Sequence, residues 1–238
     1  KHLLKLIRSL GNIETMDALL KAFVSVRQSS PTVREAYFEG TILKARYHLQ
    51  RCSWPEAQST LKGLVHQKNV SRRNQAIMHN LLGCCNCIIQ EFDTAIYHFN
   101  NALKLEPNDL RIHQNLALTL EWNSKLAQAS KHWDEMLDIL DRHPLTGPPD
   151  IADFHYYFEF ETLNRLANEH AERGRWTTAL TYMHRAHRLR PDDEDLMERL
   201  FHTYQQAEQP RNARKMLERL RSLHPNEPQN ELYELDLV

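Results

Sequence analysis

Glycine and aromatic residues are scarce in this sequence, which has 6 Gly and 8% Phe, Trp and Tyr among its 238 residues. Sheet-rich folds use aromatic residues in their strands and glycine in their turns, so this scarcity favours long helices joined by short turns. No apolar run approaches the roughly 18 residues that a membrane-spanning helix requires. The net charge is −1, so no overall field favours nucleic acid or an acidic membrane surface.

Cysteine is also rare, and three of the four cysteines fall within one helical turn, at positions 84, 85 and 87. Neighbouring cysteines on a helix are poorly placed to bridge one another, so we expect reduced thiols and a cytoplasmic or nuclear location. Their side chains fan over about 300° around a helix and cannot converge on one metal ion. We predict that Cys85 packs inward, while Cys84 and Cys87 lean toward a surface groove.

Recognisable catalytic motifs are missing. The sequence contains no phosphate-binding loop, dinucleotide-binding glycine motif, serine-hydrolase elbow or zinc-protease HExxH. His184 and His187 are three residues apart and could share a metal, but no further ligand follows at a recognised spacing. The acidic run 192–195 lies at a predicted helix start, where the helix dipole favours carboxylates. We therefore expect no catalytic residues, no metal and no cofactor, and hence no enzyme.

A pattern of small, aromatic and proline residues recurs along the chain. Its best-formed copy lies in residues 76–107 and contains Leu82, Gly83, Ala95, Phe99, Ala102 and Pro107. Small residues are needed where two antiparallel helices cross closely, and the aromatic side chain fills the groove beside them. The proline ends the second helix, because it lacks an N–H and disfavours helix in the residue before it.

Five copies of this pattern can be counted from pairs of residues that are twelve apart. The pairs are Ala45 and Ala57, Gly83 and Ala95, Ala117 and Ala129, Ala167 and Ala179, and Phe201 and Ala213. Two steps between copies share one length, from Gly83 to Ala117 and from Ala167 to Phe201, and the other two steps are longer. The longest step contains residues 142–150, which hold three of the ten prolines and cannot continue a helix. This loop is either a hinge between two blocks of repeats or a solvated bulge on an unbroken array.

The residue order and the shared step of about 34 residues resemble the tetratricopeptide repeat family. The resemblance extends over about residues 32–225. It implies an all-α fold, a right-handed α-solenoid of helix–turn–helix repeats. We predict repeats one to three in 32–141, the Pro/Gly loop in 142–150, and repeats four and five in 151–225. A helical pair in 1–31 is a degenerate repeat or an N-terminal cap, and 226–238 is a C-terminal cap or tail.

The resemblance also implies a function, because the first helix of each repeat in this family commonly lines a groove for a peptide segment or a partner helix. We therefore predict a non-enzymatic scaffold or adaptor that binds a protein partner, within a larger complex or alone. The predicted partner-binding residues are Arg46, Asn80, Cys84, Cys87, Arg111, Gln114, Asn115, Asn164, Arg165, Asn168 and His202.

One ligand of the family, the C-terminal carboxylate of a chaperone, is not expected. Asn115 and Arg165 match the lysine, asparagine and arginine clamp that holds it, but other positions do not, and Glu161 would repel a carboxylate.

Two alternative functions remain open. The first is an RNA-binding helical-repeat protein that uses the basic residues between Arg185 and Arg221, although interleaved acids argue for a solvated face instead. The second is the interaction domain of a larger enzyme or complex, since the chain begins with Lys1 rather than Met.

Overall fold

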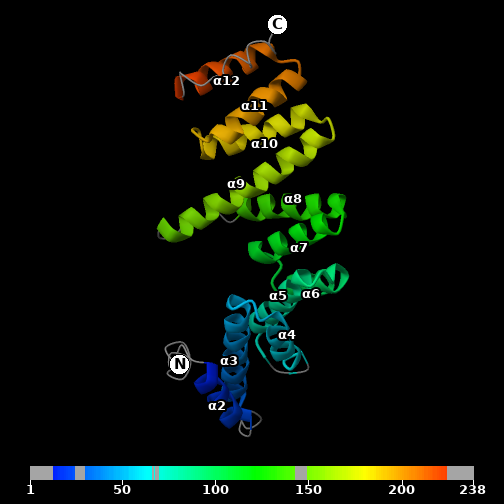
Figure 1. Cartoon of the computed structure of the whole chain (residues 1–238), viewed down its shortest axis with the longest axis vertical. Helices are drawn as coiled ribbons and strands as arrows, with labels where there is room; N and C mark the ends of the chain where they lie inside the picture. The colour runs from blue at the N-terminus through cyan, green and yellow to red at the C-terminus, as the bar shows by residue number, and fades with distance from the viewer. Residues whose placement is uncertain (1–12, 25–29, 66, 68–69, 143–148, 224–238) are drawn as a thin grey trace. The chain divides into compact units, whose positions relative to one another are not determined.

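The computed structural model describes residues 13–24, 30–65, 67, 70–142 and 149–223, and helices joined by short turns make up these ranges (Figure 1). The helices are α2 (Ile13–Val24), α3 (Pro31–Gln50), α4 (Trp54–Lys62), α5 (Arg72–Ile88), α6 (Phe92–Leu105), α7 (Leu110–Trp122), α8 (Leu126–Arg142), α9 (Pro149–Glu172), α10 (Trp176–Leu189), α11 (Glu194–Gln206) and α12 (Pro210–Leu223). The predicted all-α fold is confirmed. Across these ranges, no helix is both long enough and apolar enough to span a membrane.

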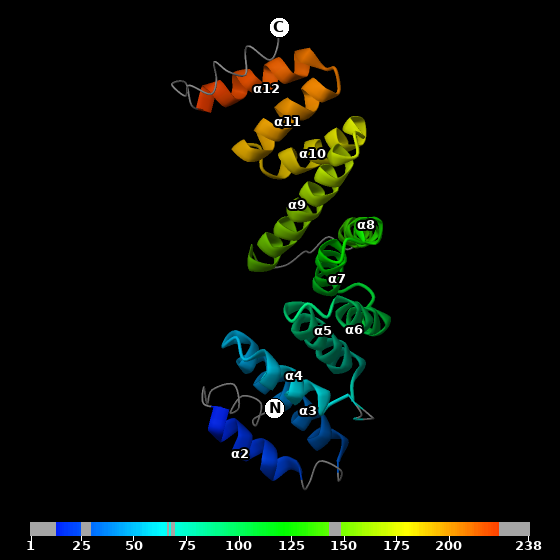
Figure 2. The ribbon, with the colours of Figure 1, turned by 45° about the vertical axis from the view of Figure 1, so that its right-hand side comes forward.

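The chain forms two compact bodies, Lys1–His132 and Trp133–Val238, and the boundary falls inside α8. In the N-terminal body, α3 pairs with α4 and α5 with α6, while α2 packs on α3, α4 on α5 and α6 on α7 (Figure 2). In the C-terminal body, α9 pairs with α10 and α11 with α12, and α10 packs on α11. Each body is thus a stack of helix pairs in which each second helix contacts the next first helix.

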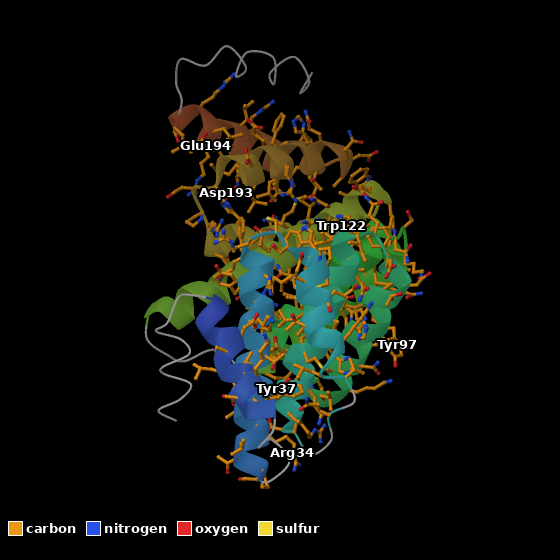
Figure 3. All side chains as sticks on the ribbon, turned by 60° about the horizontal axis from the view of Figure 1, so that its bottom comes forward. Arg34, Tyr37, Tyr97, Trp122, Asp193 and Glu194 are labelled. Carbon is orange, nitrogen blue, oxygen red and sulfur yellow. The ribbon has the colours of Figure 1, made fainter. Side chains whose placement is uncertain are left out.

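Helix starts follow from local side-chain chemistry. Ser71 precedes α5, and its hydroxyl oxygen accepts a hydrogen bond from the Asn74 backbone N–H at 3.3 Å. Asp193 caps α11 in the same way through the Leu196 N–H at 3.0 Å, beside Glu194 (Figure 3). Such caps satisfy backbone donors that have no partner inside the helix. The acidic run at 192–195 therefore stands at a helix start, as predicted.

Proline starts further helices, because its fixed φ suits the first helical turn, where no N–H is needed. One such residue, Pro149, begins α9. The loop was predicted to extend over 142–150. In the structure α8 ends at Arg142, inside the predicted loop, and α9 begins two residues before the predicted end of the loop is passed. The remainder of that loop (143–148), residues 1–12 and the predicted tail 226–238 lie outside the described residues.

The turn inside each helix pair uses one residue with left-handed backbone geometry. These residues are Cys52, Gln90, Ser124, Gly174 and Glu208, with φ between 55° and 68°. In each case the next residue donates its N–H to a carbonyl five positions earlier, as in Arg175 to His170 at 2.9 Å. This pattern is a Schellman motif, which satisfies the last carbonyls of the helix. The spacing of the turns reproduces the predicted spacing of the repeats, including the two longer steps, from Cys52 to Gln90 and from Ser124 to Gly174.

Four of these five turns carry a side chain where glycine would be unstrained. A Cβ atom in the left-handed region costs about 1 kcal/mol or more. We therefore expect Glu208→Gly, at an exposed turn, to raise the free energy of unfolding by about 0.5–1 kcal/mol. Gly174→Ala, at φ 68° with open space around its Cα, is the reciprocal control and should lower it by about 1 kcal/mol. Urea unfolding measures both changes, and a shift of the same sign in both variants would contradict this account.

Small residues line the crossings of the paired helices. The alanines of the twelve-residue pairs are at most 2% exposed, and Phe201 of the fifth pair is fully buried. At the crossing of α5 and α6, a Cβ built on Gly83 would lie 2.5 Å from the ring of Phe99. Phe99 is itself 1% exposed, so its ring has little room to move. Glycine is therefore required here by the closeness of the two helices rather than by its backbone angles.

Gly83→Ala tests this crossing. In a helix interior alanine is favoured over glycine by about 1 kcal/mol, but overpacking costs about 1–3 kcal/mol, so we expect net destabilisation. In a Phe99→Leu background the ring is gone, and the same Gly83→Ala change should become neutral or stabilising. A double-mutant cycle by urea unfolding measures this reversal. Equal effects of Gly83→Ala in both backgrounds would show that the ring contact is not the cause.

Candidate functional site

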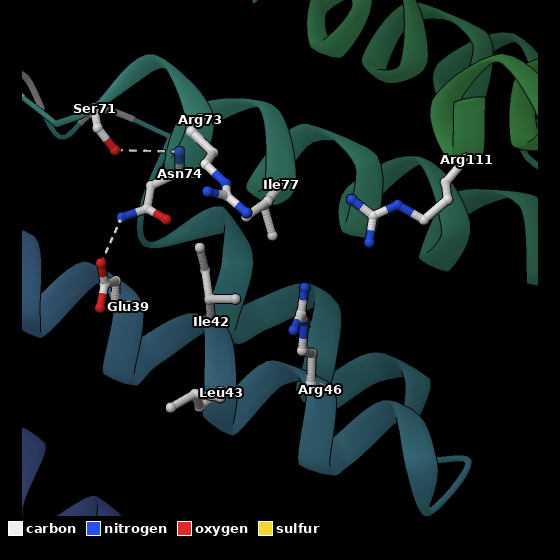
Figure 4. Close-up of a pocket in the computed structure, with 9 residues that line it drawn as sticks. All are labelled: Glu39, Ile42, Leu43, Arg46, Ser71, Arg73, Asn74, Ile77 and Arg111. Carbon is white, nitrogen blue, oxygen red and sulfur yellow. Dashed lines mark hydrogen bonds between the residues drawn. The ribbon is translucent and has the colours of Figure 1, made fainter. Parts of the chain in front are cut away.

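The N-terminal body contains a cavity of about 420 Å³ between the first helices of neighbouring repeats (Figure 4). Its lining comes from α3, from the start of α5 and from one residue of α7: Glu39, Ile42, Leu43, Arg46, Ser71, Arg73, Asn74, Ile77 and Arg111. The apolar part of the wall is formed by Ile42, Leu43 and Ile77. The cavity therefore combines an apolar wall with a polar rim, as binding sites commonly do.

Three arginines extend toward this cavity, Arg46 from α3, Arg73 from α5 and Arg111 from α7 (Figure 4). All three are exposed side chains, so water still reaches their guanidinium groups. The one carboxylate of the lining, Glu39, accepts a hydrogen bond from the Asn74 side chain at 3.3 Å. The lining therefore carries an excess of positive charge that favours an acidic ligand.

Arg111 is held in position by its neighbour Asp109, which caps α7. The guanidinium donates to both carboxylate oxygens, at 3.2 Å and 2.9 Å. The hydrogen bond to Asp109 raises the pKa of Arg111, and although burial opposes ionisation of the carboxyl, its bonds with Arg111 lower the pKa of Asp109. Two parallel hydrogen bonds of this kind fix the orientation of the planar guanidinium group.

Two of the predicted partner-binding residues, Arg46 and Arg111, line the cavity, and three others form a cluster of hydrogen bonds between α5 and α7. The Asn115 amide donates to Asn80 Oδ1 at 3.0 Å and approaches Cys84 Sγ at 3.6 Å. These groups thus link neighbouring first helices before any partner is present. The side-chain amides of Asn80 and Asn115 therefore hold α5 and α7 together and also form part of the predicted binding surface.

Two more predicted residues of the N-terminal body differ in exposure. Gln114 is half-buried on α7. Cys87 is only 8% exposed, and its sulfur lies 3.3 Å from the Thr119 hydroxyl. A partner could reach Cys87 only after local opening of the helices, so the residue acts in packing rather than at the surface.

In the C-terminal body, two predicted asparagines share one arginine. Arg199 of α11 donates to Asn164 Oδ1 at 3.1 Å and to Asn168 Oδ1 at 2.6 Å, both on α9. Arg165 and His202 are exposed, and His202 Nδ1 lies 3.3 Å from Gln205 Oε1. The first helices of this body are therefore also joined edge to edge by polar side chains.

Several site residues were not found from the sequence. Arg73 follows the extra residues of the first long step, where the helix start could not be placed by counting. Arg199 occupies the position in the fifth repeat that Arg165 occupies in the fourth, and this equivalence was the available signal. The roles of both arginines depend on contacts between neighbouring first helices, which the sequence does not specify.

The cysteine cluster has the chemistry of buried thiols. Burial, followed by the charges of Cys85 and Cys87, raises the pKa of Cys84 to about 12. Burial also raises the pKa of Cys85 to about 11, and Cys85 is 1% exposed, in the core. The thiolate is the nucleophile and the metal ligand, so these groups are poorly suited to redox or metal chemistry at neutral pH.

Histidines form two cross-helix pairs in consecutive repeats. His79 and His98 approach with their Nδ1 atoms 3.0 Å apart, and His113 and His132 with theirs 3.3 Å apart. Both members of the second pair lie one repeat period after their counterparts, at equivalent positions. This recurrence is visible in the sequence, whereas the predicted pair His184 and His187 does not recur. His184 instead hydrogen-bonds with the Tyr204 hydroxyl.

Burial, together with the nearby positive charges of His79 and Lys62, lowers the pKa of His98 to about 4. The folded protein thus keeps His98 neutral at a pH where the unfolded chain, with a pKa of 6.5, binds a proton. Its contribution to stability is full above pH 6.5 and declines as the pH falls toward about 4. We expect His98→Gln to reduce the acid-induced fall in melting temperature over this range. An unchanged pH profile in the variant would contradict the assignment.

The stacked pairs and their recurring Schellman turns define a helical-repeat protein, and comparison with known proteins gives a family match for one part of the chain. Residues 170–232 match the sequence model of the tetratricopeptide repeat. The match covers the end of the chain, and the helical fold of the described residues is consistent with it.

One curated relative is the protein O-mannosyl-transferase Tmtc2 of Drosophila melanogaster, which is 30% identical over 108 residues. The alignment covers 45% of this chain and 10% of that protein, so the chain corresponds to a small part of the relative.

Solved structures share the fold at low sequence identity. BtubC from P. vanneervenii is 15% identical with a TM-score of 0.62, covering 90% of this chain and 91% of that one. YrrB, described as a tetratricopeptide-repeat protein with an unusual peptide-binding site, is 15% identical with a TM-score of 0.58, covering 82% and 90%. At these identities the likeness concerns the fold.

Proposed function

We propose that this chain is a non-catalytic protein-interaction scaffold that binds an acidic segment of a partner protein through the arginine-lined cavity. The observation that carries the proposal is the convergence of Arg46 and Arg73 beside an apolar wall, with Arg111, which already pairs with Asp109, completing the lining. Arginine binds carboxylates through paired hydrogen bonds, and the neighbouring isoleucines and leucine offer contact area to apolar side chains. The occupant is thus a segment in which Asp or Glu alternates with apolar residues.

The repeat fold supports this function. Stacked helix pairs present long surfaces built from first helices, and proteins of this family act in general through protein–protein interaction. YrrB, which shares the fold, is described by its peptide-binding site. The polar links of Asn115 to Asn80 and of Arg199 to Asn164 keep neighbouring first helices in register, which reduces the entropy lost on binding.

The transferase name of the Drosophila relative does not extend to this chain in our proposal. The shared segment is 10% of that protein, and we assign it an interaction role rather than the transfer chemistry. The chain could serve as the interaction part of a longer protein or complex without any catalytic residue of its own.

RNA binding through the second-helix arginines is less well supported by their contacts. Arg185 forms ion pairs with Asp141 at 2.5 Å and Glu159 at 2.7 Å. Arg219 pairs with Asp192 at 3.2 Å. Carboxylates that already neutralise these groups would compete with phosphates for them, so we favour the arginine-lined cavity.

A peptide selection tests the proposal. We expect phage-displayed random peptides selected on the native chain to be enriched in Asp or Glu next to apolar residues, and their binding to weaken with salt. Arg46→Glu/Arg73→Glu should weaken the selected peptides by about tenfold or more, because two attractive charge pairs become repulsive.

Arg211→Glu/Arg214→Glu is the matched control, since it makes the same charge change at exposed sites of α12. It should leave peptide affinity unchanged, and circular dichroism should show equal helix content in all variants. Peptides without acidic residues, or equal binding by the cavity variant, would refute the proposal.

A further inference from the structure

The second histidine pair has the geometry of a metal-binding site. His113 and His132 lie on neighbouring helices, α7 and α8, with their Nδ1 atoms 3.3 Å apart and their ring centroids 5.5 Å apart. With Zn–N bonds of about 2.0–2.1 Å, tetrahedral coordination places two ligand nitrogens about 3.3 Å from each other. The two imidazoles therefore already have the separation that one shared ion requires.

The protein also fixes the tautomer of one ring. His113 Nε2 lies 2.8 Å from the Pro107 carbonyl oxygen, which can only accept a hydrogen bond. The Nε2 atom must therefore carry the proton in the neutral ring, and Nδ1 has a lone pair directed toward His132. Metal-binding histidines commonly donate their second ring N–H to a backbone carbonyl in this way. His113 is 5% exposed, so its orientation is set by packing as well.

A carboxylate follows on the same helix face. Glu135 comes three residues after His132 in α8, a spacing that places two side chains on one face of a helix. In the preceding repeat the residue at the equivalent position is Asn101, three residues after His98. The two pairs thus share their histidines and differ in the third group, because only the later repeat offers a carboxylate there.

We propose that His113 and His132 bind a divalent transition-metal ion of the Zn²⁺ type through their Nδ1 atoms, with Glu135 as a further ligand. Imidazole nitrogen and carboxylate oxygen are ligands that Zn²⁺ accepts readily. Without metal, the His132 Nδ1–H donates to His113 Nδ1. On binding, that proton moves to Nε2 of the same ring and both lone pairs face the ion. The ion links the two helices of the third repeat, independently of the arginine-lined cavity.

The experiment uses Zn²⁺ alone, and Co²⁺ as its spectroscopic substitute, on the whole chain. We expect saturable Zn²⁺ binding by calorimetry and a higher melting temperature in its presence, because the ion binds the folded state. Bound Co²⁺ should show visible d–d absorption without the near-ultraviolet band of a cobalt–thiolate bond, which separates this site from the cysteines.

His132→Gln should abolish the Zn²⁺-dependent rise in melting temperature. Glu135→Asn, which introduces the residue of the preceding repeat, should weaken Zn²⁺ by about tenfold or more. His98→Gln, the matched change one repeat earlier, should retain native Zn²⁺ affinity. Retained binding in His132→Gln, or loss of binding in His98→Gln, would overturn the assignment.

A measurement on the native chain covers the case in which His132→Gln folds poorly. Long-range proton–nitrogen NMR spectra should show the Nδ1 resonances of His113 and His132 shifting on addition of Zn²⁺, with His113 Nε2 still protonated. Zn²⁺ that shifts other histidines, or a thiolate band with Co²⁺, would contradict the proposal.

Discussion

Close approach of paired helices is the constraint on which the rest of this structure depends. At the α5–α6 crossing no side chain larger than hydrogen fits at Gly83, because the Phe99 ring occupies the space. The equivalent crossings use alanines that are almost completely buried. Short distances between the helices allow each pair to act as one unit, and its remaining apolar face is then covered by the next pair.

The Schellman turns maintain this arrangement along the sequence. A left-handed residue ends each first helix at the same register, so the second helix leaves in the same direction in all five pairs. Insertions are accommodated outside these turns, and in the step from Ser124 to Gly174 much of the extra length extends α9, which has 24 residues against 13 in α7 and in α11. The left-handed turn geometry is thus the same in each pair, although four of the five turn residues are not glycine and carry the strain of a positive φ.

Helix packing brings polar side chains together in two ways, between neighbouring first helices and between the two helices of one pair. Edge-to-edge contact of first helices joins Asn80 to Asn115, and it places Arg46 and Arg73 around one cavity. Contact between the two helices of one pair instead brings together His113 and His132. Both results follow from the same repeat, because residues separated by one repeat period occupy equivalent places on successive pairs.

The sequence by itself determined the helical class, the five-fold repetition and the residues at the crossings, because each depends on local spacing and on side-chain size. It also indicated Arg46 and Arg111 as surface residues. Tertiary structure alone decided that Cys87 is buried, that Arg73 joins the cavity and that Arg199 holds two asparagines. These outcomes depend on the distances between helices that are far apart in sequence, which helical periodicity does not specify.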